Sequence, residues 1–193
     1  MANTNVSLPL ILGISGASGV VYGIRTLEIL KSLNIESHLI VSKSAELTMT
    51  YEVDTTPKQV RQLATKVHPI GDVGASVSSG SFKTRGMLIL PCSIRTMSEI
   101  ASGVTTSLMS RAADVVLKER RRLVLGVRET PLHVGHLRTM TQIAEMGGVV
   151  APIVPAFYNR PKSLEEIIDH TIGRLLDHFD IDAGLVSPWR SDD

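Results

Sequence analysis

Short apolar runs alternate with longer segments of helical period along most of this chain, and this alternation constrains the fold more than any other feature. The apolar runs are rich in Val, Ile and Leu and cover residues 8–14, 37–41, 86–90, 123–127 and 149–153. Such runs are typical of strands buried on both faces of a parallel sheet. The intervening segments predict helices over residues 20–33, 43–51, 93–102, 107–119, 134–146 and 163–179. Strands that alternate with helices form successive βαβ units, so we predict a parallel α/β fold.

The length of the chain limits the number of domains. With 193 residues, 43% of them hydrophobic, the chain can bury one well-covered core and is too short for two ordinary domains. We therefore expect a single domain over residues 1–193, with a flexible N-terminus at 1–7 and a C-terminal tail at 180–193. The Gly- and Ser-rich segment 69–82 predicts a loop or lid.

Charge and cysteine content indicate the compartment and the class of partner. The formal net charge is only +1, which gives no overall electrostatic attraction to nucleic acid or to an anionic membrane. No apolar run approaches the roughly 20 residues that span a bilayer, so we expect no membrane insertion. Cys92 is the single cysteine, and no basic segment precedes the apolar run 8–14 as it would in a signal peptide. We expect a cytoplasmic protein whose ligand binds locally.

Polar residues follow four of the predicted strands, where ligands collect in parallel sheets. They are Ser-Gly-Ala-Ser-Gly at 15–19, Ser42-Lys43, Pro-Cys-Ser-Ile-Arg-Thr at 91–96, and Arg128-Glu129. Gly16 and Gly19 allow a tight turn, and the helix that follows them offers free N–H groups and the positive end of its dipole. The four strand ends together predict a cradle for a nucleotide or a phosphate.

The first loop favours a mononucleotide such as FMN. Its glycines are spaced G-x-x-G-x-x-G, which differs from the dinucleotide fingerprint, and no Gly-Lys-Ser/Thr follows to form a P-loop. Ser42-Lys43 stands where an acidic residue would hold the ribose of NAD. Hydroxyl and N–H donors for one phosphate are what FMN needs, and the helix start at 93–96 offers a second such site.

A simpler interpretation stays open for the serines. Ser18, Ser42 and Ser93 can each be no more than a helix cap. Arg128 is harder to explain in structural terms alone, because it ends an apolar strand at the edge where ligands bind.

We predict structural roles for the single cysteine and for a pair of histidines. No general base stands beside Cys92, which favours a small buried thiol over a nucleophile. His133 and His136 lack a Cys or carboxylate at ligand spacing, so we expect no metal site.

With these motifs the chain resembles the flavin prenyltransferases of the UbiX type, within the flavin-containing cysteine decarboxylase superfamily. Besides the strand-end motifs, the resemblance rests on Gly-Ile at 13–14, Arg-Ala-Ala-Asp-Val-Val-Leu-Lys-Glu-Arg at 111–120, Leu-Val-Leu-Gly-Val-Arg-Glu-Thr-Pro-Leu at 123–132 and Pro-Ala-Phe-Tyr at 155–158. It implies a three-layer, Rossmann-like (flavodoxin-like) parallel sheet flanked by helices. It also implies a large homo-oligomer, a dodecamer, whose sites are built from neighbouring subunits.

The resemblance further implies a reaction. A dimethylallyl group would pass from dimethylallyl phosphate to N5 and C6 of reduced FMN, phosphate would leave, and a UbiD-type decarboxylase would receive the prenylated FMN. The pathway would be ubiquinone biosynthesis or aromatic acid decarboxylation.

Site residues follow from the same resemblance. FMN would contact Gly16, Ala17, Ser18, Ser42, Ser93, Ile94, Arg95, Thr96 and Arg128. Dimethylallyl phosphate would lie near Arg111, Lys118, Glu129, Tyr158, Arg174 and Trp189. Catalytic roles would fall to Ser18, Glu52, Lys118 and Glu129, with Glu52 and Ser18 moving the proton that C6 loses.

Two alternatives are weighed against this function. Phosphopantothenoylcysteine decarboxylase uses FMN on the same fold, but its family carries Pro-Ala-Ser-Ala-Asn-Thr where this chain has the motif at 91–96. A non-catalytic flavin-binding protein resembling flavodoxin would not need Lys118, Glu129 and Arg174 beside its flavin.

Overall fold

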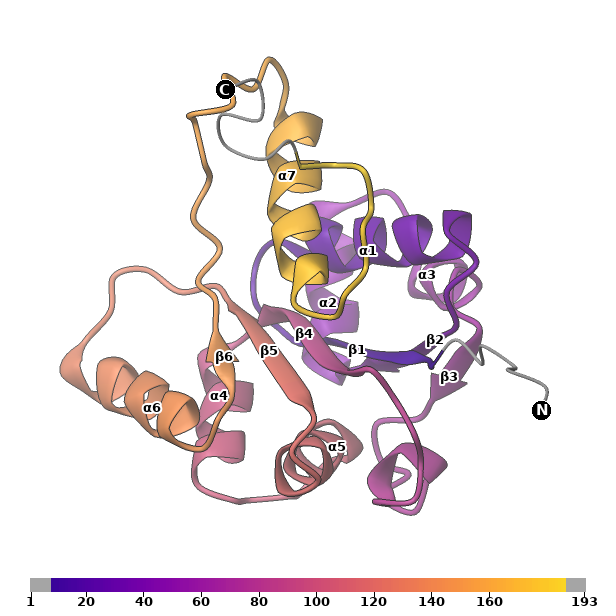
Figure 1. Cartoon of the computed structure of the whole chain (residues 1–193), viewed down its shortest axis with the longest axis vertical. Coiled ribbons are helices and arrows are strands. Elements are labelled where there is room, and N and C mark those ends of the chain that lie inside the picture. The colour runs from indigo at the N-terminus through magenta and orange to yellow at the C-terminus, as the bar shows by residue number, and fades with distance from the viewer. Residues whose placement is uncertain (1–7, 187–193) are drawn as a thin grey trace, which may run out of the picture.

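The computed structural model describes residues 8–186, and its centre is a six-stranded parallel sheet (Figure 1). The strands are β1 (Leu10–Ile14), β2 (Ser37–Val41), β3 (Lys66–His68), β4 (Gly86–Cys92), β5 (Arg122–Val127) and β6 (Val149–Val150). Their order in the sheet is β3-β2-β1-β4-β5-β6. The predicted α/β class is therefore confirmed. The expectations for residues 1–7, for the end of the tail and for Trp189 lie outside the described residues.

The edges of the sheet differ from the sequence prediction. All five predicted strands are present, but β3 was not predicted, because it has only three residues and its first, Lys66, is exposed. Without β3 the strand order is that of flavodoxin-like sheets, and with β3 it is the Rossmann order. The last strand is shorter than predicted, although Val127 continues the pairing through backbone hydrogen bonds to Ala151 and Ile153.

Helices cover both faces of the sheet (Figure 1). The core on one face includes α1 (Val20–Ser32), α2 (Lys43–Glu52), α3 (Pro57–Arg61) and α7 (Leu164–Asp177). The core on the other includes the short 3₁₀ turn η1 (Ser76–Ser78), α4 (Ile94–Ala101), α5 (Leu108–Lys118) and α6 (Val134–Glu145). The six predicted helices are confirmed within a few residues. The unpredicted α3 starts with a capping box between Thr56 and Gln59 and has Pro at its start, signals that the sequence does contain.

Burial on both faces explains the continuous apolar runs. In β1, Leu10 and Leu12 pack toward α1 and α7 while Ile11 packs toward the opposite helices, and all three are fully buried. Alternate residues of one strand thus serve two cores, as expected for a sheet covered on both sides.

The segment predicted as a loop or lid is packed against the sheet. Val77 in η1 is buried in the core on the α5 side. Arg121 donates hydrogen bonds from its guanidinium to the carbonyl oxygens of Gly80 and Phe82, which ties the end of the segment to the end of α5. Within residues 8–186, no helix has the length and apolar character required to cross a membrane.

Candidate active site

A cleft opens where the chain changes faces of the sheet. After β1 the chain enters α1 on one face, and after β4 it enters α4 on the other, so the two loops separate at the carboxyl ends of adjacent strands. Ligands of doubly wound sheets bind at this switch point. The cleft has a volume of about 470 Å³, within the range of small-molecule sites. Predicted site residues that line it are Gly16, Ser42, Ser93, Ile94, Arg95, Thr96 and Glu129.

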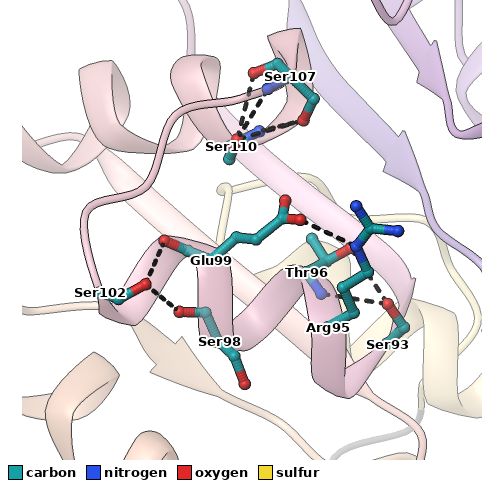
Figure 2. A network of polar contacts seen from close by, with 8 residues as sticks. All are labelled: Ser93, Arg95, Thr96, Ser98, Glu99, Ser102, Ser107 and Ser110. Atoms are coloured by element: carbon teal, nitrogen blue, oxygen red, sulfur yellow. Dashed lines mark hydrogen bonds and ion pairs between the residues drawn. The ribbon is translucent and has the colours of Figure 1, made fainter.

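Two helices begin at the cleft with capped N-termini. The Ser42 hydroxyl accepts a hydrogen bond from Ala45 N (3.0 Å) at the start of α2. Ser93 accepts from Thr96 N (3.2 Å) at the start of α4 and donates to the Thr96 hydroxyl (3.1 Å) (Figure 2). The cap interpretation is thus confirmed for Ser42 and Ser93. Their positions also bring two helix N-termini, each with free N–H groups and positive partial charge, to one cleft.

The rest of this wall is a network of short-range contacts on α4 and at the start of α5 (Figure 2). Arg95 pairs with Glu99 one turn later, with 3.0 Å between Nε and Oε1, yet its side chain is 81% exposed. Ser107 and Ser110 form the capping box of α5. Because exposed ion pairs are weak, the Arg95 side chain can leave Glu99 and turn toward an anionic ligand at little cost in free energy.

Ser18 is not a helix cap. Gly19 occupies the N-cap of α1 with φ of 97°, and the carboxylate of Glu52 accepts from Gly19 N (2.8 Å) and Val20 N (3.1 Å). The Ser18 hydroxyl hydrogen-bonds to the same carboxylate. The last residue of α2 therefore closes the start of α1, and this contact joins the two predicted catalytic residues.

Glu52 is held in its charged form. Partial burial acts to raise the pKa of its carboxyl, but hydrogen bonds from the Ser18 hydroxyl and two backbone N–H groups, with the positive charge of Arg128, outweigh burial. The pKa of Glu52 therefore lies below its usual value. Arg128 directly follows β5, and its backbone N–H donates a hydrogen bond to the Cys92 carbonyl at the end of the neighbouring strand β4 (3.1 Å). A carboxylate that is ionised at neutral pH can accept a proton there.

Tyr158 and Arg174 lie in a separate pocket of about 270 Å³, between the segment after β6 and α7. The Tyr158 hydroxyl lies 3.0 Å from Nε2 of His170, and Arg174 pairs with Asp177 at 2.7 Å. His178 also lines this pocket; partial burial and then the charges of Arg122 and Arg174 lower its pKa. The sequence-based reasoning did not identify the two histidines.

Lys118 lies far from the cleft of its own chain. It is the last residue of α5, and Ser107 and Met109 at the start of α5 line the cleft. An α-helix of that length rises about 15 Å between its ends. The Lys118 Nζ pairs with Glu119 at 2.5 Å, and Arg111 pairs with Asp114 at 2.8 Å. One chain therefore does not bring Lys118 together with Glu129.

Several lining residues were missed, for two reasons. Lys43, which the sequence placed in the strand-end cradle, does line the cleft, whereas Ser44, the next residue, was not named although it follows the same strand end. Ile70, Thr106 and Met109 come from segments that approach the cleft only in the folded chain.

Cys92 and the histidine pair occupy structural positions. Cys92 is fully buried, and burial raises the pKa of its thiol, so the prediction of a buried structural thiol is confirmed. His133 accepts from Gly135 N (3.0 Å) as part of the α6 cap, with its ring 3.6 Å from that of His136. The described part of the chain contains no group of three or more His, Cys, Asp or Glu that could hold a metal ion.

Comparisons with known proteins identify the family of the chain. Residues 2–182 match the sequence model of the family described as Flavoprotein. The chain is 57% identical over 173 residues to flavin prenyltransferase UbiX of Escherichia coli K12, covering 89% of this chain and 92% of the relative.

Solved structures agree over nearly the whole chain. AnUbiX in complex with FMN and dimethylallyl pyrophosphate superposes with a TM-score of 0.93 at 49% identity, covering 95% of this chain and 98% of that one. A dodecameric FMN-dependent UbiX-like decarboxylase from Escherichia coli O157:H7 gives a TM-score of 0.92 at 40% identity, covering 95% and 100%. The chain belongs to the Flavoprotein family and, within it, to the flavin prenyltransferases of the UbiX type.

Proposed function

We propose that the protein joins the dimethylallyl group of dimethylallyl phosphate to N5 and C6 of reduced FMN and releases phosphate. The observation that carries the proposal is the cleft at the switch point, which is lined by two capped helix N-termini and by Gly16; Ser18, two residues further along the same loop, is hydrogen-bonded to Glu52. The relative AnUbiX, whose fold this chain shares, was crystallised with FMN and dimethylallyl pyrophosphate.

The cleft fits FMN in size and in chemistry. Donor N–H groups at the starts of α2 and α4 suit its phosphate or its ring carbonyls, and Gly16 leaves room where a side chain would collide with Ser44. Residues that we propose to hold FMN are Gly16, Ala17, Ser18, Ser42, Ser93, Ile94, Arg95, Thr96 and Arg128. Reduced FMN supplies the nucleophilic atoms N5 and C6.

The protein's own residues would move a proton and neutralise a leaving group. We propose that Glu52, held ionised by its surroundings, accepts the proton that C6 loses, with Ser18 positioned to relay it. A monophosphate leaves slowly unless its charge is neutralised. Lys118 and Arg174 would each contribute about 1.5–3 kcal/mol through charge-assisted contacts.

The remaining substrate contacts are proposed on the same grounds. Glu129 lines the cleft itself, and Arg111 lies on α5. The faces of Tyr158 and Trp189 would stabilise positive charge on the allyl group.

We propose that the site is completed by neighbouring subunits of a homo-oligomer, a dodecamer. Lys118 lies about 15 Å along α5 from the cleft of its own chain, which supports a role in a neighbour's site. Large apolar side chains on the surface, including Tyr51 (80% exposed), Val154 (72%) and Phe157 (67%), are typical of subunit contacts. The relative from Escherichia coli O157:H7 is dodecameric.

The cellular setting is proposed from the chemistry. A prenylated flavin that the enzyme releases needs a recipient, and we propose a UbiD-type decarboxylase. The absence of a spanning helix among residues 8–186 is compatible with the cytoplasmic location that we propose. We also propose that the whole chain forms one domain.

Anaerobic incubation with reduced FMN and dimethylallyl phosphate tests the function directly. We expect the released flavin to gain the mass of one five-carbon unit, with one phosphate freed per flavin. Oxidised FMN serves as the control, because it lacks the nucleophilic N5 electron pair. Tight FMN binding without product would favour a cysteine-adduct decarboxylase or a flavin carrier instead.

Gly16→Ala is expected to weaken FMN binding. A Cβ at this position would lie 2.3 Å from the Cβ of Ser44, so the loop and the start of α2 must separate. Such overpacking costs about 1–3 kcal/mol, and if half of this cost falls on the FMN-bound state, the FMN affinity is about 2- to 13-fold weaker. Quenching of flavin fluorescence measures the dissociation constant. Gly71→Ala, where no atom lies within 4 Å of the new Cβ, is the matched control and should bind as the wild type does.

A further inference from the structure

The Ser15 side chain joins the two walls of the cleft beyond the last paired residues of β1 and β4. The paired register of β1 and β4 ends at Gly13 and Ile89. Past that point the Ser15 hydroxyl donates to the Pro91 carbonyl (3.0 Å) and accepts from Ser93 N (2.7 Å). The Ser15 side chain is fully buried and does not line the cleft itself.

We propose that Ser15 is a positioning residue that sets the separation of the two FMN-binding loops, an inference that rests on the proposed function. Gly16, the next residue, lies in one wall of the cleft, and Ser93 caps the helix in the other. The Ser15 backbone N–H also donates to the Pro91 carbonyl (3.2 Å), and the hydroxyl extends this contact to Ser93 at the start of α4. Loss of the hydroxyl leaves the backbone bond to Pro91 in place but removes the acceptor of the Ser93 N–H, so the α4 N-terminus can shift relative to the first loop.

The opposite end of the same strand pair contains a matched contact. The Thr84 hydroxyl lies 2.6 Å from the Pro9 carbonyl oxygen, just before β1, and accepts from Gly86 N (3.2 Å) at the start of β4. Thr84 is buried as well. Ser15 and Thr84 thus each join β1 to β4, one at the cleft and one at the far edge. A role in stability alone predicts equal consequences for the two, whereas a role in positioning predicts a difference in FMN binding.

The test compares Ser15→Ala with Thr84→Val in the full-length protein. Both variants should lower the melting temperature, because each loses a buried hydrogen bond. Only Ser15→Ala should raise the dissociation constant of FMN, by about 10-fold, the factor that roughly 1.4 kcal/mol produces. Ser15→Thr, which keeps the hydroxyl, should restore the affinity.

Each outcome decides the inference. Unchanged FMN affinity in Ser15→Ala, or equal weakening in Thr84→Val, would overturn it. If Ser15→Ala does not fold, Ser15→Thr decides the inference. A folded Ser15→Thr protein with weakened FMN binding would overturn the inference, and a folded Ser15→Thr protein with wild-type FMN binding would support it. Wild-type protein that binds FMN without prenylating it would instead count against the proposed function and leave the Ser15 comparison valid.

Discussion

Glu52→Gln is expected to slow formation of prenylated FMN by about 10²–10⁴-fold while FMN still binds. The glutamine amide oxygen can still accept from Gly19 N and Val20 N, so the cap on α1 is retained. It cannot take up a proton. The variant therefore separates the structural role of Glu52 from its chemical one.

Single-turnover mass analysis of the flavin measures the rate, and a melting curve reports the fold. Glu46→Gln is the matched control on the same helix, because Glu46 pairs with Arg61 and does not touch Glu52. Product formation by Glu52→Gln at the wild-type rate would show that the proton goes elsewhere.

The acid side of the pH profile gives a second readout of the same group. The folded-state pKa of Glu52 is lowered from 4.5, so its charge stabilises the fold above that value, and this contribution disappears as the pH falls through the lowered pKa. The rate should fall in the same direction, because a protonated carboxyl cannot accept a proton. Glu52→Gln should lack this dependence.

Coexpressed Lys118→Ala and Glu52→Gln subunits are expected to recover activity that neither variant has alone. If Lys118 acts in a neighbour's site, a mixed oligomer contains some sites with both wild-type residues. With equal, random mixing, about one quarter of the sites are intact, the product of two independent halves. The reason is geometric, since Lys118 stands at the far end of α5 from its own cleft.

Two different affinity tags isolate the mixed oligomers, and phosphate release measures their rate per subunit. Ser18→Ala coexpressed with Glu52→Gln is the control, because these side chains hydrogen-bond within one chain and mixing restores no more than the unmixed rates. Lack of recovery in the Lys118→Ala mixture would place Lys118 outside the neighbour's site.

The apolar runs of the sequence predicted most strands of the sheet but missed the edge strand β3. Strands buried on both faces must be apolar at every position, which makes β1 and β4 visible without any tertiary information. The edge strand β3 pairs only with β2 and has an exposed Lys66, so its sequence carries little strand signal. The burial of Val77 within the Gly- and Ser-rich segment was also missed, because a single apolar residue among Gly and Ser carries no periodic signal.

The carboxyl-end residues were predictable because parallel topology brings strand ends to one edge. Ser42 and Ser93 therefore appear in the cleft as expected, although their side chains serve as helix caps. Glu52 shows the limit of this reasoning. Its spacing along the chain marks only a carboxylate at a helix end, and its role as the cap of α1 depends on a contact across 33 positions.

The sequence by itself determined the alternation of strands and helices, the anion-binding strand ends and the family, because each of these depends on short stretches of neighbouring residues. Only the tertiary structure decided that Ser18 and Glu52 share one contact, that Tyr158 and Arg174 occupy a separate pocket, and that Lys118 lies at the end of α5 far from its own cleft. These facts depend on how helices of given length lie against the sheet, and distance in space between such elements is not a property of local sequence.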